Sequence, residues 1–193
     1  MAIPSFAAAQ DSSQNMRLVS ANARLVHRLD SKDARQGQIV AAQLTSDVKG
    51  SGSMELPKGT MLMGKVEQVQ MSSNNGPARM SIVFDQARLS NGQSVPVKAT
   101  LLAAYPADTG DYFAVTGITG TAMAGQPHFI PDDQQIDQVV GSLSHVSMHS
   151  AVQSNASGVF MSTDRNIDLS KGTQLQIAIA PETSSSKGMA SGQ

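Results

Sequence analysis

The sequence contains no cysteine and no tryptophan, and aromatic residues make up only 4% of its 193 residues. Without cysteine, the chain has no disulfide framework, no thiolate nucleophile and no cysteine-based metal site. Charged residues are scarce at 15%, with 14 basic and 15 acidic side chains and a net charge of −1. That balance lacks the basic footprint of a nucleic-acid or anionic-lipid binder, so we expect neither partner.

Long apolar runs are also lacking. No segment approaches the roughly 18 apolar residues that a membrane-spanning helix requires, so no membrane insertion is expected. The uncharged polar residues that replace lysine and glutamate suit short strands and loops better than long surface helices. The length fits one domain or two very small ones.

The first ten residues contain Ala7-Ala8-Ala9, and a polar stretch follows from Asp11. Small residues at this spacing are typical of a signal-peptidase site, whereas a basic start and most of an apolar centre are lacking. We interpret residues 1–16 as a signal-peptide remnant and disordered N-terminus; the alternative is an ordinary disordered terminus. The chain is therefore expected to be periplasmic or otherwise exported, with one domain over 17–182 and a disordered tail over 183–193.

A seven-residue unit, Leu-x-Lys-Gly-Thr-x-Leu, occurs twice, at Leu56–Leu62 and Leu169–Leu175. Each copy predicts a glycine turn that leads into a strand, and the alternation after Thr60 separates Leu62, Gly64 and Val66 from Met61 and Met63. The two units bracket most of the chain.

Between these units, turn signals separate short alternating segments. Asn91-Gly92 is a strong hairpin signal between the alternating residues 78–89 and the returning strand 94–104, where Pro96 indicates an edge or a bulge. Residues 38–48 also predict a strand, and residues 105–131 predict a long loop with one short strand at 113–115. The fold class is all-β, an antiparallel β-barrel or sandwich.

One short amphipathic helix is expected near residues 132–143. Asp132 or Asp133 would cap it, and apolar residues follow at i, i+3, i+4 and i+7. Those four positions are Ile136, Val139, Val140 and Leu143.

The order of these segments resembles the C-terminal β-barrel of TrbI-like proteins, the envelope-spanning scaffold subunits of conjugation and type IV secretion machines. The resemblance rests on residues 38–48, on Pro57-Lys-Gly-Thr60 with its strand, on residues 80–97 with their Asn-Gly hairpin, and loosely on Lys171–Ile177. It implies a barrel fold and an interaction role. This chain shows no membrane helix, Pro-rich spacer or apolar antenna: residues 132–160 are too polar to enter lipid.

Two motifs invite a chemical interpretation. Asp108-Thr109-Gly110 matches the aspartic-protease tripeptide, but Asp111 follows where a small residue is usual, and a solvated turn is the favoured alternative. Thr116–Gly120 has the glycines of a phosphate-binding loop without the following lysine and helix, so a flexible loop is favoured.

Metal binding is the other candidate chemistry. His145 and His149 are four residues apart and, with Met148, could meet a metal from one helix face. Thioethers are soft Cu(I) ligands, and Met61, Met63 and Met71 are among eleven methionines; the alternative places Met61 and Met63 in the core. His27 and His128 are isolated, and we interpret them as surface or hydrogen-bonded residues.

Lys58 and Lys171 occupy the repeated turns, either as ligand contacts or, as we favour, as exposed residues beside a required glycine.

No catalytic, cofactor-binding or metal-binding residue is assigned, and no cofactor is expected. The expected function is a non-enzymatic exported envelope module with a structural or protein-interaction role, through a protein partner or self-association. The alternative is a periplasmic small-ligand or metal-binding protein that uses residues 105–131 and the His145–His149 face.

Overall fold

The computed structural model describes residues 18–49, 55–74, 76–107 and 135–181, with the backbone alone described for residues 135–142 and 181. Six antiparallel strands close into a barrel in the order β6-β3-β1-β13-β8-β7, and β7 pairs back onto β6. These strands are β1 (Val19–Leu25), β3 (Ile39–Leu44), β6 (Met61–Gln70), β7 (Ala78–Arg88), β8 (Ser94–Tyr105) and β13 (Gln174–Pro181).

The barrel interior is filled with apolar side chains. Alternate residues of each strand point inward, as in β1, where Val19, Ala21, Ala23 and Leu25 are all buried. The inward positions of the other strands supply the bulkiest members of the core, and interior side chains fill a barrel of this size. They include Leu62, Met80, Ile82, Phe84, Leu101, Leu175, Ile177 and Ile179.

Four short strands lie beside the turns that connect the barrel strands. They form two separate pairs, β2 (Leu29–Asp30) with β12 (Asp168–Leu169) and β4 (Val48–Lys49) with β5 (Glu55–Leu56). The predicted strand over residues 38–48 is confirmed for 39–44 by β3, whereas residues 45–47 are not in a strand and Val48 begins β4. The predicted Asn-Gly hairpin is confirmed at the β7–β8 connection, where Gly92 has a φ of 84°.

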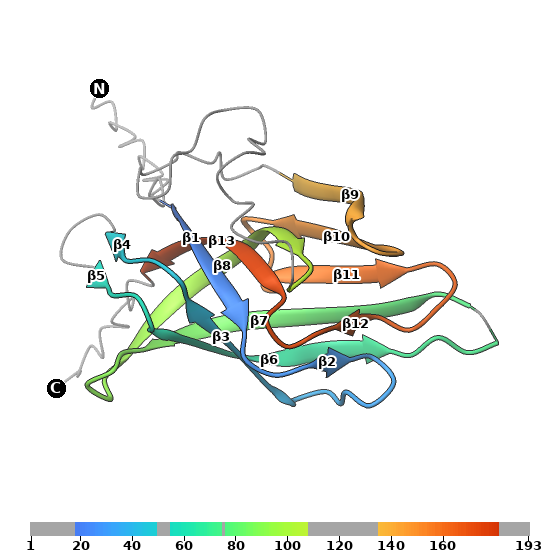
Figure 1. Ribbon diagram of the computed structural model, residues 1–193, viewed down its shortest axis with the longest axis horizontal. Coiled ribbons are helices and arrows are strands. Elements are labelled where there is room, and N and C mark those ends of the chain that lie inside the picture. Colours follow the sequence, from blue (N-terminus) through green and yellow to red (C-terminus); the bar gives the residue numbers. More distant parts are fainter. Residues whose placement is uncertain (1–17, 50–54, 75, 108–134, 182–193) are drawn as a thin grey trace, which may run out of the picture.

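The sheet continues past the barrel on one edge of β7. There β11 (Gly158–Ser162) pairs with residues 78–82 of β7, and β10 (Val146–Ala151) and β9 (Gln135–Leu143) follow outward. The same edge of β7 pairs with β8 only at residues 86–88. Figure 1 shows β9, β10 and β11 lying beside β7 on the right of the view. Strand β7 therefore belongs to both the barrel and this outward extension.

Ser157 holds the fork where β8 and β11 separate along β7. Its N–H donates to the carbonyl of Ile82 (2.8 Å), and its carbonyl accepts from the N–H of Leu101 (2.7 Å). Its hydroxyl accepts from the N–H of Phe84 at 2.8 Å. The next residue, Gly158, leaves no room for a side chain, because an added Cβ would lie 2.6 Å from Cδ1 of Leu101.

The expected amphipathic helix over residues 132–143 is wrong over its described part. Residues 135–143 form strand β9 and pair with β10, for example Gln138 with Met148 and Ile136 with Ser150. The apolar spacing fits a helix, but Ile136, Val139 and Val140 are β-branched, and such residues favour strands. The described residues contain strands and no helix.

Several predictions fall on residues that the structure does not describe. They are the signal-peptide remnant and N-terminus, the short strand at residues 113–115, the capping Asp132 or Asp133 and the tail after residue 182. The proposed domain limits of 17 and 182 stay predictions.

Replacing Ser157 with alanine is expected to weaken the whole fold, because the buried N–H of Phe84 loses its acceptor. An unsatisfied buried donor costs about 1–3 kcal/mol of unfolding free energy. Urea unfolding followed by circular dichroism measures this cost. The exposed Ser94→Ala is the matched control and should change the free energy by less than about 0.5 kcal/mol. Equal stability of the two variants would contradict the role of Ser157.

Candidate functional site

The first Lys-Gly-Thr unit forms a tight turn between β5 and β6. The N–H of Thr60 donates to the carbonyl of Pro57 (3.1 Å), and Gly59 adopts a φ of 89°, which favours glycine. Gly59 donates to the carbonyl of Leu44 (2.9 Å), and Leu44 donates back to Thr60 (2.9 Å). The turn is thereby fixed to the end of β3.

The second unit repeats this arrangement between β12 and β13. Thr173 donates to Ser170 (3.0 Å), Gly172 has a φ of 87°, and Gly172 and Thr173 exchange hydrogen bonds of 2.8 and 2.9 Å with Leu25 at the end of β1. Because β1 and β3 are antiparallel, the two turns lie at opposite ends of this strand pair. The repeated sequence is thus a repeated local structure.

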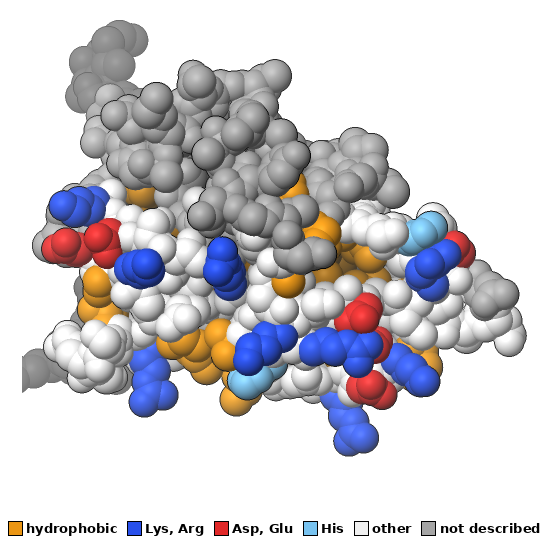
Figure 2. All heavy atoms as spheres, in the orientation of Figure 1, with side chains coloured by type: hydrophobic (Ala, Val, Ile, Leu, Met, Phe, Trp, Pro, Cys, Tyr) orange, Lys and Arg blue, Asp and Glu red, His pale blue; other side chains and the backbone are white. Residues whose placement is uncertain are grey.

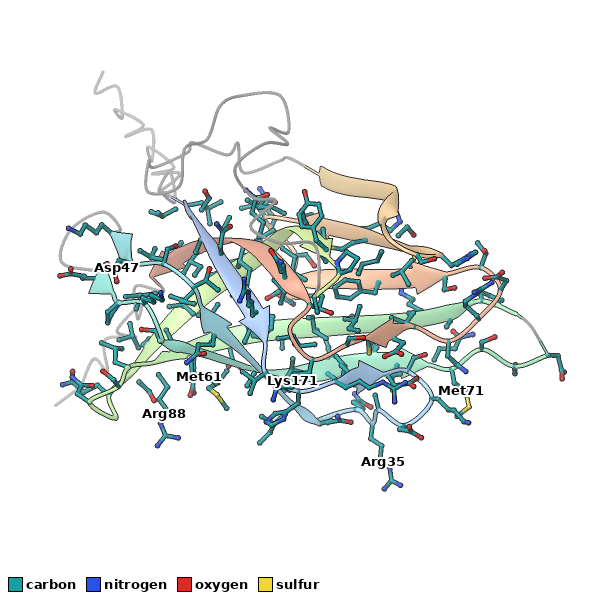
Figure 3. The ribbon with its side chains drawn as sticks, viewed as in Figure 1. Arg35, Asp47, Met61, Met71, Arg88 and Lys171 are labelled. Carbon is teal, nitrogen blue, oxygen red and sulfur yellow. The ribbon has the colours of Figure 1, made fainter. Side chains whose placement is uncertain are left out.

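Lys58 and Lys171 are exposed at these turns, as the favoured interpretation predicted. The backbone N–H of Lys58 donates to a carboxylate oxygen of Asp47 (2.7 Å), which fixes the turn without using the lysine side chain. Asp47 marks the first turn and Lys171 lies in the second, and Figure 3 shows the two residues well apart. Neither lysine lines either of the two cavities described below.

His145 and His149 do not share a helix face. His145 lies in the β9–β10 turn with a φ of 62°, and His149 lies on β10. Four residues along a strand span about 13 Å, whereas the same spacing on a helix brings side chains together. Met148 is buried while His149 is exposed, so the two point to opposite faces. Among the described residues, no group of three or more His, Cys, Asp or Glu side chains could hold a metal ion.

The alternative interpretation of Met61 and Met63 as core residues is wrong. Leu62 and Val66 point into the barrel, whereas Met61 and Met63 lie on its outer surface and are half-buried. Met71, just after β6, is 56% exposed. Figure 3 places Met61 and Met71 far apart, so these thioethers do not meet as a ligand set.

The remaining sequence candidates have simpler outcomes. His27 is exposed, as expected. The tripeptide at residues 108–110, the glycine loop at 116–120 and His128 lie outside the described residues, as does most of the loop from 105 to 131.

An end pocket of about 480 Å³ lies between the β9–β10 turn, the end of β8 and the segment around β12. Its charged and amide groups are engaged in hydrogen bonds. Asp168 accepts from Arg28 at 2.8 and 3.0 Å, and Oδ1 of Asn166 accepts from the N–H of Ser72 at 2.9 Å. Its other lining residues are Pro106, Ala107, Leu143, Ser144, Val146, Arg165, Ser170 and Thr173.

These ion pairs shift the acid–base behaviour of exposed groups at this end of the molecule. Hydrogen bonding to Asp168 raises the pKa of Arg28. Hydrogen bonding from Arg165, with the charges of Arg165 and His145, lowers the pKa of Asp164.

An outer groove of about 550 Å³ crosses strands β3, β6, β7 and β8 on the surface of the barrel. Ile39 and Met63 give it an apolar wall, and Lys65, Asp85 and Arg88 give it charge. Ile39 is 71% exposed, the highest value among the described large hydrophobic residues. None of these residues except Met63 was singled out from the sequence. The sequence offered two signals for this groove. One was a glycine inside a strand, Gly64, and the other was two consecutive polar residues in a strand, Asp85 and Gln86, because both patterns mark a bulge.

The described part of the chain is thus an all-β protein built on a closed antiparallel barrel with an extended sheet. No protein-family model matches the sequence, and no curated protein matches it. Among solved structures, it is similar to ComB10 of the Com type IV secretion system of Helicobacter pylori, at 14% identity and a TM-score of 0.37. The similarity covers 89% of this chain and 90% of that one. It concerns the course of the chain and extends to no activity or partner.

None of the described residues forms a helix long and apolar enough to cross a membrane.

Replacing Arg165 with glutamine is expected to raise the pKa of Asp164 toward its ordinary value, because the main interaction that lowers it is removed. A lowered carboxyl pKa favours the folded state above the unfolded-state pKa, and this contribution disappears as the pH falls through the folded-state pKa. Titration of the carboxyl carbon by NMR measures the shift. Arg35→Gln, at an exposed arginine elsewhere, is the control; a similar shift in both variants would contradict the assignment.

Proposed function

We propose that this chain is a non-enzymatic β-barrel module of the cell envelope that acts by binding another protein. The observation that carries the proposal is the exposure of large apolar side chains on the barrel strand β3, just after β6 and on the outward strand β11. Ile39, Met71 and Met161 are 71%, 56% and 38% exposed. The packed sheet holds Ile39 and Met161 at fixed positions, which suits a binding surface.

Polar features of the molecule support a structural role. The Arg28–Asp168 and Asn166–Ser72 contacts join segments distant in the sequence. The carboxylates of Asp30 and Asp168 both pair with Arg28 rather than with each other, unlike the paired carboxylates of acid–base catalysis. Support for export comes from Ala7-Ala8-Ala9, whose small residues resemble a signal-peptidase site.

A second candidate function, small-ligand binding, is favoured by the size of the end pocket. Its volume of about 480 Å³ falls within the range of small-molecule sites. Native mass spectrometry of the protein purified from its host tests this function. A stoichiometric adduct that is lost in Arg165→Ala would support it, and an unmodified mass would contradict it.

In-host photo-cross-linking tests the leading proposal. A photoreactive amino acid is placed singly at positions 39, 71 and 161 of the full chain, and at the exposed hairpin residue Gln93 as a control. We expect a discrete cross-linked product in the envelope fraction from at least one apolar position and none from Gln93. Location of the protein in the cytosolic fraction, or no product from any apolar position, would overturn the proposal.

A further inference from the structure

The outer groove has the features of a specific binding surface, and the inference drawn from it rests on the proposed function. Its apolar wall follows from strand register: on β3 and β6, Ala41 pairs with Met63 and Gln43 pairs with Met61. Because Leu62 must point inward, Met61 and Met63 point outward. Ile39 stands on the same outer face of β3, two residues before Ala41.

The floor of the groove is a bulge between β6 and β7. Met63 pairs with Gln86 and Gly64 with Phe84, so Asp85 is an extra residue on β7. Asp85 and Gln86 are both exposed as a result. Gly64 is required at this contact, since an added Cβ would lie 1.9 Å from the carbonyl oxygen of Val83. Such bulges are specified features that redirect side chains.

The charges of the groove are available to a partner. Lys65 and Arg88 are exposed, and among the described residues neither forms an ion pair. Asp85 is the one carboxylate among the lining residues, so the groove carries an excess of positive charge. In Figure 3, Arg88 and Met61 project from the same side of the barrel, and Figure 2 shows hydrophobic side chains beside Lys and Arg at that edge.

Methionine side chains suit such a surface, because flexible thioethers adapt to the shape of apolar partners. We propose that the outer groove binds a segment of a different protein, whose apolar side chains contact Ile39 and Met63 and whose carboxylates pair with Lys65 and Arg88. A concave floor containing Asp85 fits this occupant better than a flat anionic bilayer does. Symmetric pairing of two copies would leave four cationic groups facing two carboxylates.

Selection of random phage-displayed peptides on the purified full chain tests the proposal. We expect enriched peptides that combine aspartate or glutamate with large apolar residues. Their dissociation constants should rise about tenfold or more for Met63→Ser and for Lys65→Gln/Arg88→Gln, and should also rise with added salt. Met71→Ser, at an exposed methionine outside the groove, is the matched control and should bind normally. Circular dichroism verifies that each variant is folded.

Three results would overturn the proposal. The first is no enrichment, or peptides that bind the groove variants undiminished. The second is binding to phosphatidylglycerol vesicles that Ile39→Ser abolishes, which would identify a membrane surface. The third is sedimentation as a dimer that Ile39→Ser dissociates, which would identify a second copy as the occupant. Cross-linking at positions 71 and 161 separates this failure from that of the proposed function, because products there would leave the interaction role standing.

Discussion

Hydrogen bonding along both edges of β7 is the constraint on which the rest of the structure depends. One edge closes the barrel against β6, and the other passes from β8 to β11 within a few residues. Ser157 makes that change possible by bonding the backbone of both β7 and β8. Since a buried backbone group without a partner is costly, Ser157 couples the stability of the barrel to that of its extension.

The same strand shapes the surface that we propose for binding. The bulge turns the neighbouring side chains of Asp85 and Gln86 outward. Because Leu62 points into the core, Met61 and Met63 lie on the outside of β6. The groove is therefore a consequence of how the core is filled. Mutations in the core at this point would be expected to alter binding as well as stability.

The sequence allowed the turns and hairpins to be predicted well, because glycine conformations and Asn-Gly loops are local properties. The twin Lys-Gly-Thr units confirm this in detail. The helix prediction for residues 132–143 failed over its described part, because the apolar spacing fits a helix whereas β-branched residues and pairing with β10 favour a strand. Alternation also separated the two faces of β6, and the charged residues Lys65 and Glu67 on the face of Met61 and Met63 were the signal that this face points outward. The groove depends on register between distant strands, which no local signal gives.

The pairing of β1 with β13 has a consequence for how the chain folds during its synthesis. These strands come from opposite ends of the described sequence, and β13 lies between β1 and β8 in the barrel. A ribosome-bound chain therefore cannot close its barrel until β13 has been synthesised. Closure of such distant contacts is slow, because the entropy of a long loop is lost before the contacts form.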